Sequence, residues 1–453
     1  MRNDLSNNDY LEPGIFNNFV DLLEKKQSKT ILTKIRNYHP SEIAGFIQIL
    51  KRDHRRKLFK ILENKFDSRI LVELDPEFLK IIIDEIDFKI IFSAVNELES
   101  DEAVSILKIL DFEKRNKILS KIPKESRILF EDNLSYPDNS AGKLMQVELV
   151  KVSLNNTVGE IIDLLRKSKN LPKVFYDLFV TDDKNKYLGT IPLSTIITSV
   201  RGIKVLDIMR KNEKSVHFLL DQEDVADLFR KRNLTSIAVV DNKKRLLGSI
   251  NIEDVVDVID DEAEEDLLRL AGVSEQNFYG AIINVTKSRF TWLFFNLFAA
   301  FFASYVIKNF ENTIANLAIL AALMPVIASM GGCSGTQSLT TAVRALAMKQ
   351  ITLSNSIRSV FKEVLIGFFN GVIFSSIAFI LTKIWFDDIE LSLIISVALF
   401  INLIFGSFFG VCIPILLTRL KIDPAVASGT FVTMLTDIFG FFLFLSLANI
   451  YLI

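Results

Sequence analysis

One acidic side chain stands deep inside the last apolar stretch of the sequence. Asp437, in TFVTMLTDIFGFF, is the only acidic residue between Pro424 and the C-terminus. A carboxylate within a membrane-spanning helix is costly, and by default it marks an ion pathway that faces the interior of a helix bundle. The alternative is a protonated or hydrogen-bonded aspartate with a structural role. We expect Asp437 to bind an ion.

A second set of carboxylates forms a dense run upstream. Nine residues between Glu253 and Asp266 are acidic, and no Lys or Arg interrupts them. Carboxylate oxygens without sulfur or imidazole suit Mg²⁺ or Ca²⁺ rather than a transition metal. A solvated helix face is the alternative interpretation. Because the run precedes the apolar half of the chain, a cation bound there could be coupled to the membrane region.

The two parts of the 453-residue chain differ sharply in composition. The first 290 residues carry most of the charge, whereas the remainder is dominated by Phe, Leu, Ile, Ala and Gly. Five apolar stretches are long enough to cross a hydrocarbon layer of about 30 Å. These predicted spans are Thr291–Ile307, Ile314–Met330, Val360–Leu381, Leu391–Leu417 and Pro424–Ile453.

Charges between the spans predict the orientation in the inner (cytoplasmic) membrane. Lys and Arg gather before the first span, between the second and third, and between the fourth and fifth. Since cytoplasmic loops carry the excess of basic residues, we expect a cytoplasmic N-terminus and an outside C-terminus. The first residues, MRNDLSNNDYLEPG, lack the apolar core of a cleaved signal peptide.

Several other functions are disfavoured by composition. The formal net charge of −2 gives no reason to expect nucleic acid as a partner. The two cysteines, Cys333 and Cys412, lie in the apolar half and do not suggest a disulfide framework. His39, His54 and His217 are scattered, and no nucleophile–base spacing or phosphate-binding loop is present, so we do not expect an enzyme.

The start of the soluble region repeats every twelve residues. One apolar column recurs at this interval, and each member is followed by a turn signal such as LDPE or LDFE. The column is Leu50, Leu62, Leu74, Ile86, Leu98, Leu110 and Ile122. Twelve residues hold one short helix and a tight connection, and such units must stack to bury their apolar faces. The period predicts an α-superhelical domain.

A longer repeat follows this domain. LFVTDDKNKYLGTIPL (178–193) matches IAVVDNKKRLLGSINI (237–252), with Asp182 against Asp241 and Gly189 against Gly248. An amphipathic helix precedes each copy, so we expect two hairpins with glycine turns, each with its helix. The pattern resembles a tandem pair of CBS domains. Such pairs often bind adenine nucleotides; a structural or ion-sensing pair is the alternative.

Taken together, the motifs resemble the MgtE family of magnesium channels and transporters over nearly the whole chain. The matching motifs are HPSEIAGF (39–46), SYPDNSAGKLM (135–145), EEDLLRLAGV (264–273), MPVIASMGGCSGTQSLTTAVRALA (324–347) and DPAVASGTFVTMLTDIFGF (423–441). The resemblance implies a multidomain membrane protein: a cytoplasmic α-superhelical N-domain (1–137), CBS repeats (138–200 and 201–262, α+β), a linking plug helix (263–289) and a five-helix transmembrane pore domain (290–453).

The resemblance also implies a homodimer whose ion pathway lies at the subunit interface. Asp437 matches the family's pore aspartate, where a Mg²⁺ ion that keeps its water would sit. Thr433, Thr436 and the backbone around Gly429 would hydrogen-bond that water. Cytoplasmic Mg²⁺ bound between N-domain, CBS pair and plug helix would hold the pore shut. By position, the sensing candidates are Asp101, Glu102, Asp257, Glu262, Glu265 and Asp266.

Two positions depart from the family pattern. The family usually has Asn-Ala where this chain has Cys333-Ser334, and Pro where it has Thr430. We expect a glycine-rich break in the backbone at GGCSGTQ, at the cytoplasmic end of the second span, because irregular backbone at membrane depth is tolerated where it lines a cavity. The residues expected to shape this break and line the pore are Gly331, Gly332, Cys333, Gly335 and Gln337.

Two rival functions remain open from the sequence. One is transport of another divalent cation, such as Co²⁺, Mn²⁺ or Ni²⁺. The other is a CBS-controlled membrane sensor that conducts nothing. A thiolate metal site at Cys333 is disfavoured, because no second Cys or His is near it in the sequence.

Overall fold

The computed structural model describes residues 13–168, 171–211, 215–273, 282–352, 354–426 and 429–452. Two compact units are present, Met1–Glu262 and Ala263–Ile453. Residues 1–12 lie outside the described residues. They include most of MRNDLSNNDYLEPG, the start of the chain, in which we expect no signal peptide. Residues 274–281 of the predicted plug helix also lie outside the described residues.

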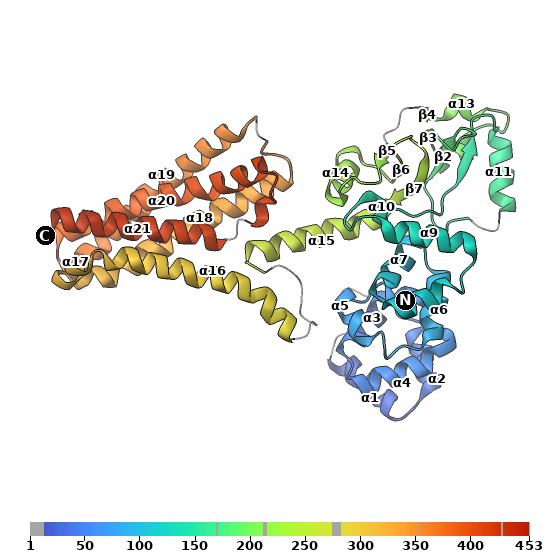
Figure 1. Ribbon diagram of the computed structural model, residues 1–453, viewed down its shortest axis with the longest axis horizontal. Coiled ribbons are helices and arrows are strands. Elements are labelled where there is room, and N and C mark those ends of the chain that lie inside the picture. Colours follow the sequence, from blue (N-terminus) through green and yellow to red (C-terminus); the bar gives the residue numbers. More distant parts are fainter. Residues whose placement is uncertain are drawn as a thin grey trace, which may run out of the picture. The chain divides into compact units, whose positions relative to one another are not determined.

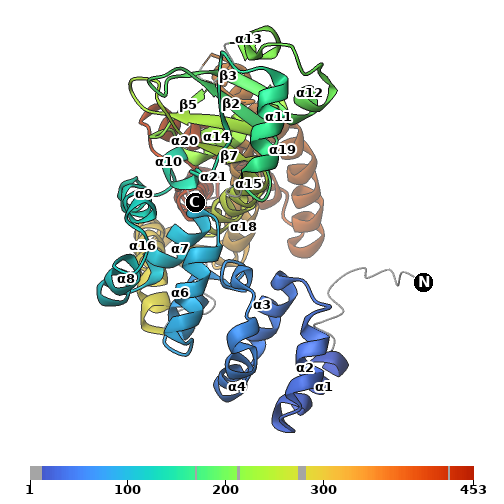
Figure 2. The ribbon, with the colours of Figure 1, turned by 90° about the vertical axis from the view of Figure 1, so that its right-hand side faces the viewer.

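Short helices stacked one after another form the first part of the N-terminal unit (Figures 1 and 2). They are α1 (Pro13–Glu24), α2 (Ser28–Ile35), α3 (Pro40–Ile49), α4 (Arg52–Leu62), α5 (Pro76–Ile82), α6 (Phe88–Glu97), α7 (Ser100–Ile109), α8 (Phe112–Leu119) and α9 (Lys124–Ser135). Two 3₁₀ turns, η2 (Glu63–Lys65) and η3 (Ser68–Leu71), connect α4 to α5. The α-superhelical fold expected from the sequence is confirmed.

The twelve-residue period explains where these helices begin. All seven members of the apolar column, from Leu50 to Ile122, are buried and at most 8 % exposed. After three of them, Asp75, Asp87 and Asp111 accept hydrogen bonds from backbone N–H groups in the first turn of the next helix. Such caps satisfy donors that a helix start leaves unpaired. Each of these three repeats thus ends one helix with a buried residue and starts the next with an aspartate cap.

Two small sheets complete the N-terminal unit (Figure 1). The first has the order β1-β2-β3-β4 and the second β5-β6-β7. The strands are β1 (Lys151–Ser153), β2 (Asp177–Thr181), β3 (Tyr187–Pro192), β4 (Arg210–Lys211), β5 (Ser215–His217), β6 (Ser236–Val240) and β7 (Leu246–Asn251). The helices are α10 (Ala141–Leu144), α11 (Val158–Lys167), α12 (Leu193–Thr198), α13 (Val205–Ile208) and α14 (Gln222–Arg232). Both predicted hairpins and both amphipathic helices are present.

The glycines of the long repeat do not form the hairpin turns, and that expectation was wrong. Gly189 and Gly248 lie within β3 and β7, paired with β2 and β6. Asn185 and Lys244, which have positive φ, make the turns instead. A Cβ at Gly189 or Gly248 would overlap with a backbone carbonyl oxygen of Arg210 or Gln146. The glycines therefore permit close approach of a neighbouring segment to each hairpin.

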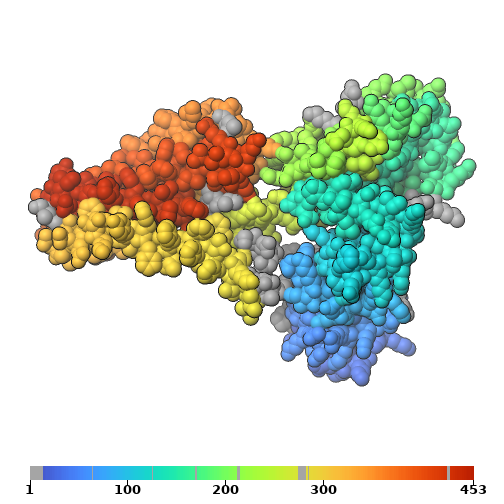
Figure 3. All heavy atoms as spheres, in the orientation of Figure 1, coloured from blue at the N-terminus to red at the C-terminus, as the bar shows by residue number. Residues whose placement is uncertain are grey.

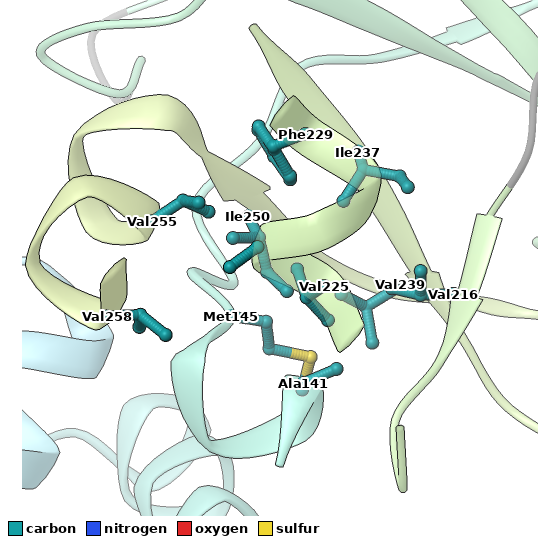
Figure 4. Close-up of a cluster of buried hydrophobic side chains, with 11 residues drawn as sticks. Ala141, Met145, Val216, Val225, Phe229, Ile237, Val239, Ile250, Val255 and Val258 are labelled. Atoms are coloured by element: carbon teal, nitrogen blue, oxygen red, sulfur yellow. The ribbon is translucent and has the colours of Figure 1, made fainter. Parts of the chain in front are cut away.

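The apolar core of the second repeat is shown in Figure 4. Val225 and Phe229 of α14 pack there with Val239 of β6 and Ile250 of β7. Val255 and Val258, from the first turns of α15 (Ile252–Leu270), belong to the same cluster. The acidic run therefore lies on a helix whose first turns are anchored by Val255 and Val258 in the core of the second repeat.

Five long apolar helices form most of the C-terminal unit, side by side (Figures 1 and 3). They are α16 (Ile282–Lys308), α18 (Ile319–Ala347), α19 (Ser356–Phe386), α20 (Ile389–Arg419) and α21 (Gly429–Tyr451). Each is long and apolar enough to cross a membrane. Two short elements, α17 (Glu311–Asn316) and η4 (Pro424–Val426), precede α18 and α21. The five predicted spans therefore correspond to five helices.

The expected break at GGCSGTQ is absent, because α18 continues through it from Ile319 to Ala347. Its glycines serve helix packing instead. A Cβ at Gly331 would overlap with Asn402 of α20, and one at Gly335 with Val432 of α21. Gly406 and Gly410 of α20 are equally close to the backbone of α18. Small residues let membrane helices approach closely, and these small-xxx-small patterns pack helices within one subunit.

Candidate functional site

A groove runs between α18 and α21 in the C-terminal unit. Its volume is about 860 Å³ and it is open along one side. The lining residues are Ala328, Ser329, Gly332, Cys333, Thr336, Gln337, Thr433 and Asp437. Their spacing of three or four positions places them on one face of each helix. The close approach depends on Gly332, where a Cβ would lie 3.2 Å from the methyl carbon of Thr433.

Asp437 contributes the only carboxylate among the residues that line this groove. Its Oδ1 atom is buried and accepts no hydrogen bond from any described residue. A buried acceptor without a donor is costly. A cation that kept its water shell could supply the missing donors from its water molecules. The groove therefore has the geometry and the charge of a cation-binding surface.

Four of the residues predicted to line a pore lie in this groove with Asp437. They are Gly332, Cys333, Gln337 and Thr433. The Cys333 side chain is exposed there. Thr433 donates its hydroxyl proton to the Gly429 carbonyl oxygen at 2.7 Å, so its oxygen can still accept a bond from water.

Three other predicted residues are packed between helices, outside the groove lining. Gly331 and Gly335 are buried against α20 and α21. Thr436 is fully buried and donates to the Thr433 carbonyl oxygen at 2.9 Å. Gly429 begins α21, and a Cβ there would lie 3.6 Å from the hydroxyl oxygen of Thr336. Gly429 therefore adjoins the groove.

Sequence reasoning missed Ala328, Ser329 and Thr336. The signal was available, because Ser329, Gly332, Cys333 and Thr336 are spaced as one face of a helix. It was overlooked because the segment was interpreted as a break in the helix.

A second group of carboxylates lies in the N-terminal unit. These acids interact electrostatically with one another, and they come from segments far apart in the sequence. The members are Glu73, Glu99, Asp101, Glu102, Glu148, Glu253, Asp254 and Asp257. We refer to them below as the acidic cluster.

Two half-buried aspartates, Asp101 and Asp254, carry the largest pKa shifts in the acidic cluster. Burial raises the pKa of Asp101 well above its ordinary value, and the negative charges of Asp254 and Glu102 raise it further. Burial also raises the pKa of Asp254 to about 7, with smaller contributions from Glu253 and Glu99. Asp101 Oδ1 is buried without a hydrogen-bond partner among the described residues. A divalent cation would reduce the repulsion between these carboxylates and would give Asp101 Oδ1 a partner.

Neutral side chains and backbone groups hold the acidic cluster together. Gln146 donates through Nε2 to both carboxylate oxygens of Asp254, at 3.3 and 3.2 Å. The Asn251 backbone N–H donates to Asp254 Oδ2 at 3.2 Å. Ser100 accepts from the Val147 N–H at 3.0 Å through its hydroxyl oxygen. The segment after α10 thereby connects the start of α7 to the start of α15.

The six predicted sensing residues fall into two sets. Asp101, Glu102 and Asp257 belong to the acidic cluster. The other three lie further along α15, where Glu262 accepts a hydrogen bond from Gln222 at 2.8 Å and Glu265 pairs with Arg269. Asp266 is half-buried near the end of that helix.

The acidic cluster also contains acids that the sequence analysis did not select. Asp254 belonged to the acidic run, and Glu99 adjoins Asp101, so both could have been chosen. Nothing in the sequence connects Glu73 or Glu148 to them. In the described part of the chain, no three His, Cys, Asp or Glu side chains are arranged as ready-made metal ligands.

A small cleft lies between the two copies of the long repeat and is lined by residues of both. Its volume is about 220 Å³, and Tyr176, Asp177, Ser236 and Asn251 are among its lining residues. Asp177 accepts from the Ser236 hydroxyl at 2.6 Å and from the Thr235 hydroxyl at 3.3 Å. Most small-molecule sites have about 300–1,000 Å³. The cleft would have to widen to hold a nucleotide.

Three family models match the chain. One is described as a divalent cation transporter and matches residues 324–447. The MgtE intracellular N domain matches residues 38–139. The CBS domain matches twice, over 141–202 and 205–261.

Curated relatives agree with these matches. A magnesium transporter MgtE of Enterococcus faecalis is 33 % identical over 319 residues, which cover 70 % of each chain. One of the same name from Thermus thermophilus is 27 % identical over 440 residues, covering 95 % of this chain and 97 % of the relative.

A solved structure supports the fold of the N-terminal unit. It is the cytosolic domain of the Mg²⁺ channel MgtE in complex with ATP, at 24 % identity and a TM-score of 0.51. The match covers 54 % of this chain and 99 % of that structure.

Proposed function

Because the chain belongs to the MgtE family of divalent cation transporters, as its motifs indicated, we propose that it conducts Mg²⁺ across a membrane as a homodimer that internal Mg²⁺ closes. The observation that carries the proposal is Asp437. Its buried Oδ1 lacks a hydrogen-bond partner among the described residues and lies in a groove of membrane-spanning helices. The family is one of multi-pass membrane transporters rather than enzymes.

The open side of the groove is where a second subunit would complete the pathway. A two-fold axis along the groove would bring two Asp437 side chains to opposite walls. Mg²⁺ sheds its water reluctantly, so two carboxylates would hold a hydrated ion through its water molecules. Thr433, Thr336 and Gln337 offer oxygen acceptors for the same water molecules.

Internal Mg²⁺ would act through the acidic cluster. Without a cation, Asp101 and Asp254 repel each other, and this repulsion disfavours the packing of their segments. A bound Mg²⁺ ion would stabilise that packing and, through α15, the closed pore. Such a valve requires that Mg²⁺ bind the closed state more tightly than the open state. Asp257 would add to the field at this site, while Glu262, Glu265 and Asp266 would act further along α15.

The distribution of Lys and Arg supports a cytoplasmic N-terminal unit and an outside C-terminus. Arg344, Lys349, Arg358 and Lys362 lie in or near one connection, whereas the connection between α19 and α20 has a single basic residue near it, Lys383. Basic residues remain on the cytoplasmic side during insertion.

Adenine nucleotide is a second proposed ligand, bound by the CBS pair. A relative's cytosolic domain was solved with ATP. In this chain the ligand would enter the cleft beside Asp177 and displace the hydroxyl groups of Ser236 and Thr235 from that carboxylate. Adding ATP to the full chain and measuring the Mg²⁺ concentration that closes it tests this role.

Growth of a bacterial strain without its own Mg²⁺ uptake tests the main proposal. We expect the chain to restore growth at low Mg²⁺, and Asp437→Ala to abolish rescue at equal expression. Normal rescue of growth by Asp437→Ala would contradict the proposal that Asp437 lines the ion pathway. Competition by Co²⁺, Mn²⁺ or Ni²⁺ against Mg²⁺ flux distinguishes transport of another divalent cation. A chain that responds to Mg²⁺ in protease protection but conducts no ion would be a sensor.

A further inference from the structure

Arg269, in the last turn of α15, connects that helix to the segment that begins α21. One guanidinium nitrogen pairs with Asp423 and the other with Glu265, one turn earlier on α15. About a third of each of the three side chains is exposed. One cation therefore lies between two carboxylates that belong to different segments of the C-terminal unit.

Asp423 is itself fixed to the start of η4. Its Oδ1 accepts a hydrogen bond from the Ala425 N–H at 2.8 Å, and Ala425 is fully buried. Since η4 leads into α21, whose residue Asp437 faces the groove, the ion pair reaches the pore helix through a short, packed segment.

Leu270, the next residue, makes the apolar part of the same connection. It packs against a cluster made of Leu339 and Val343 of α18, Ala425 of η4 and Val432 of α21. A Cβ added at Gly429 would lie 3.9 Å from the Leu270 carbonyl oxygen and 3.6 Å from Thr336, which lines the groove. The end of α15 therefore lies beside the residues that open into the groove.

We propose that Arg269 is a positioning residue that seats the end of α15 on η4 and α21 and thereby transmits the state of the acidic helix to the groove. The inference rests on the proposed function for its physiological meaning. Without the guanidinium, Glu265 and Asp423 would be like charges with no cation between them, and they would repel each other. The end of α15 would then leave its seat more readily, and the pore would close less readily.

A double-mutant cycle on the full chain in proteoliposomes tests this coupling. Asp423→Asn keeps the acceptor for Ala425, while Arg269→Gln removes the cation. Each single variant should raise the internal Mg²⁺ concentration that half-closes the pore by about fivefold. The double variant should raise this concentration by about fivefold as well, because both changes break the same interaction. Arg269→Lys should stay within about twofold of the parent. A twenty-five-fold shift in the double variant, or no shift in either single variant, would overturn the coupling.

The matched control is the ion pair between Lys383, in the last turn of α19, and Asp387, the residue that follows this helix. Lys383→Gln and Asp387→Asn change the charge by the same amounts and should leave the closing concentration unchanged. An equal shift in these controls would assign the effect to surface charge and would contradict the specific role of Arg269.

A readout that needs no ion flux separates this proposal from the proposed function. A Cβ at Gly272, two residues beyond α15, would lie 3.8 Å from the indole of Trp292. In a Trp385→Phe background, Trp292 is the sole tryptophan. Its emission should shift equally in Arg269→Gln, Asp423→Asn and the double variant. If this shift occurs in a chain that conducts no Mg²⁺, the role of Arg269 in holding the end of α15 is supported and the transport proposal fails. Unchanged emission would contradict that role of Arg269.

Discussion

Asp101 at the start of α7 and Asp254 at the start of α15 are electrostatically coupled, although one belongs to the helical repeats and the other follows the CBS strands. The charge of Asp254 is the largest charge contribution to the raised pKa of Asp101, after burial itself. Two partly desolvated carboxylates that lie close together repel each other and destabilise the packing of their segments. A cation bound between them would stabilise this packing. The predictions below follow from this pair and from the groove at Asp437.

Removing the charges of Asp101 and Asp254 should stabilise the N-terminal unit in the absence of Mg²⁺ and should weaken its response to added Mg²⁺. We expect Asp101→Asn with Asp254→Asn to raise the Mg²⁺ concentration for half-maximal protease protection about tenfold, which corresponds to about 1.4 kcal/mol. In EDTA the same variant should melt at a higher temperature than the parent, because the repulsion is gone. Glu113→Gln, an exposed acid outside the cluster, is the control. Unchanged Mg²⁺ sensitivity in the double variant would contradict a role for this pair.

Acidification should weaken the response to Mg²⁺. The pKa of Asp254 is raised to about 7, so the carboxyl group is largely protonated at pH 6 and ionised at pH 8. A metal ion must displace that proton, so affinity falls as the pH falls through 7. We expect the half-closing Mg²⁺ concentration to rise by up to about tenfold from pH 8 to pH 6. Asp254→Asn should flatten the dependence; an equally steep profile in that variant would assign it to other groups.

Much of the fold follows from periodicity in the sequence. The column from Leu50 to Ile122 located the helices of the repeats, because one buried apolar residue recurs in each unit and an aspartate cap follows three of them. Asp437 could be chosen because a lone acid is costly in an apolar helix and therefore indicates a function. The spacing of the polar and small residues in 329–336 would have allowed a continuous helix to be predicted through this segment. The partners that require its glycines, Asn402 and Val432, lie in other helices and could not be predicted. Likewise, Glu148 interacts with Glu99, and Asp254 with Asp101, only through tertiary packing.

The native cysteines offer a test of which surface faces the ions. Cys333 is exposed in the groove with Asp437, whereas Cys412 of α20 is partly buried outside it. A positively charged thiol reagent should therefore remove most of the Mg²⁺ flux of the parent, and Cys333→Ser should be protected. Cys412→Ser should remain as sensitive as the parent.

Cys333→Asn, which restores the residue usual in the family, should conduct at least as well as the parent. Loss of flux in Cys333→Asn, or inhibition of the Cys333→Ser chain by the reagent, would contradict this picture of the groove.

The packing of α18 against α20 should be sensitive to one added methyl group. A Cβ at Gly410 would lie 2.8 Å from the Cβ of Ser338 and would overlap with the Gly335 carbonyl oxygen. We expect Gly410→Ala to cost about 1–3 kcal/mol of stability, as overpacking usually does. Gly202→Ala, with no heavy atom within 4 Å of its new Cβ, should be neutral. A parent-like melting temperature for Gly410→Ala in detergent would show that these helices can separate at little cost.

Mg²⁺ flux into proteoliposomes, measured with the parent chain and with Asp437→Asn at matched incorporation, tests the central claim most directly. Asn keeps the size of the side chain and removes the charge that would hold a hydrated cation. We predict Mg²⁺ flux for the parent that falls as Mg²⁺ on the side of the N-terminal unit rises, and flux at the level of empty liposomes for Asp437→Asn. Parent-like flux through Asp437→Asn would contradict the assignment of the groove as the ion pathway.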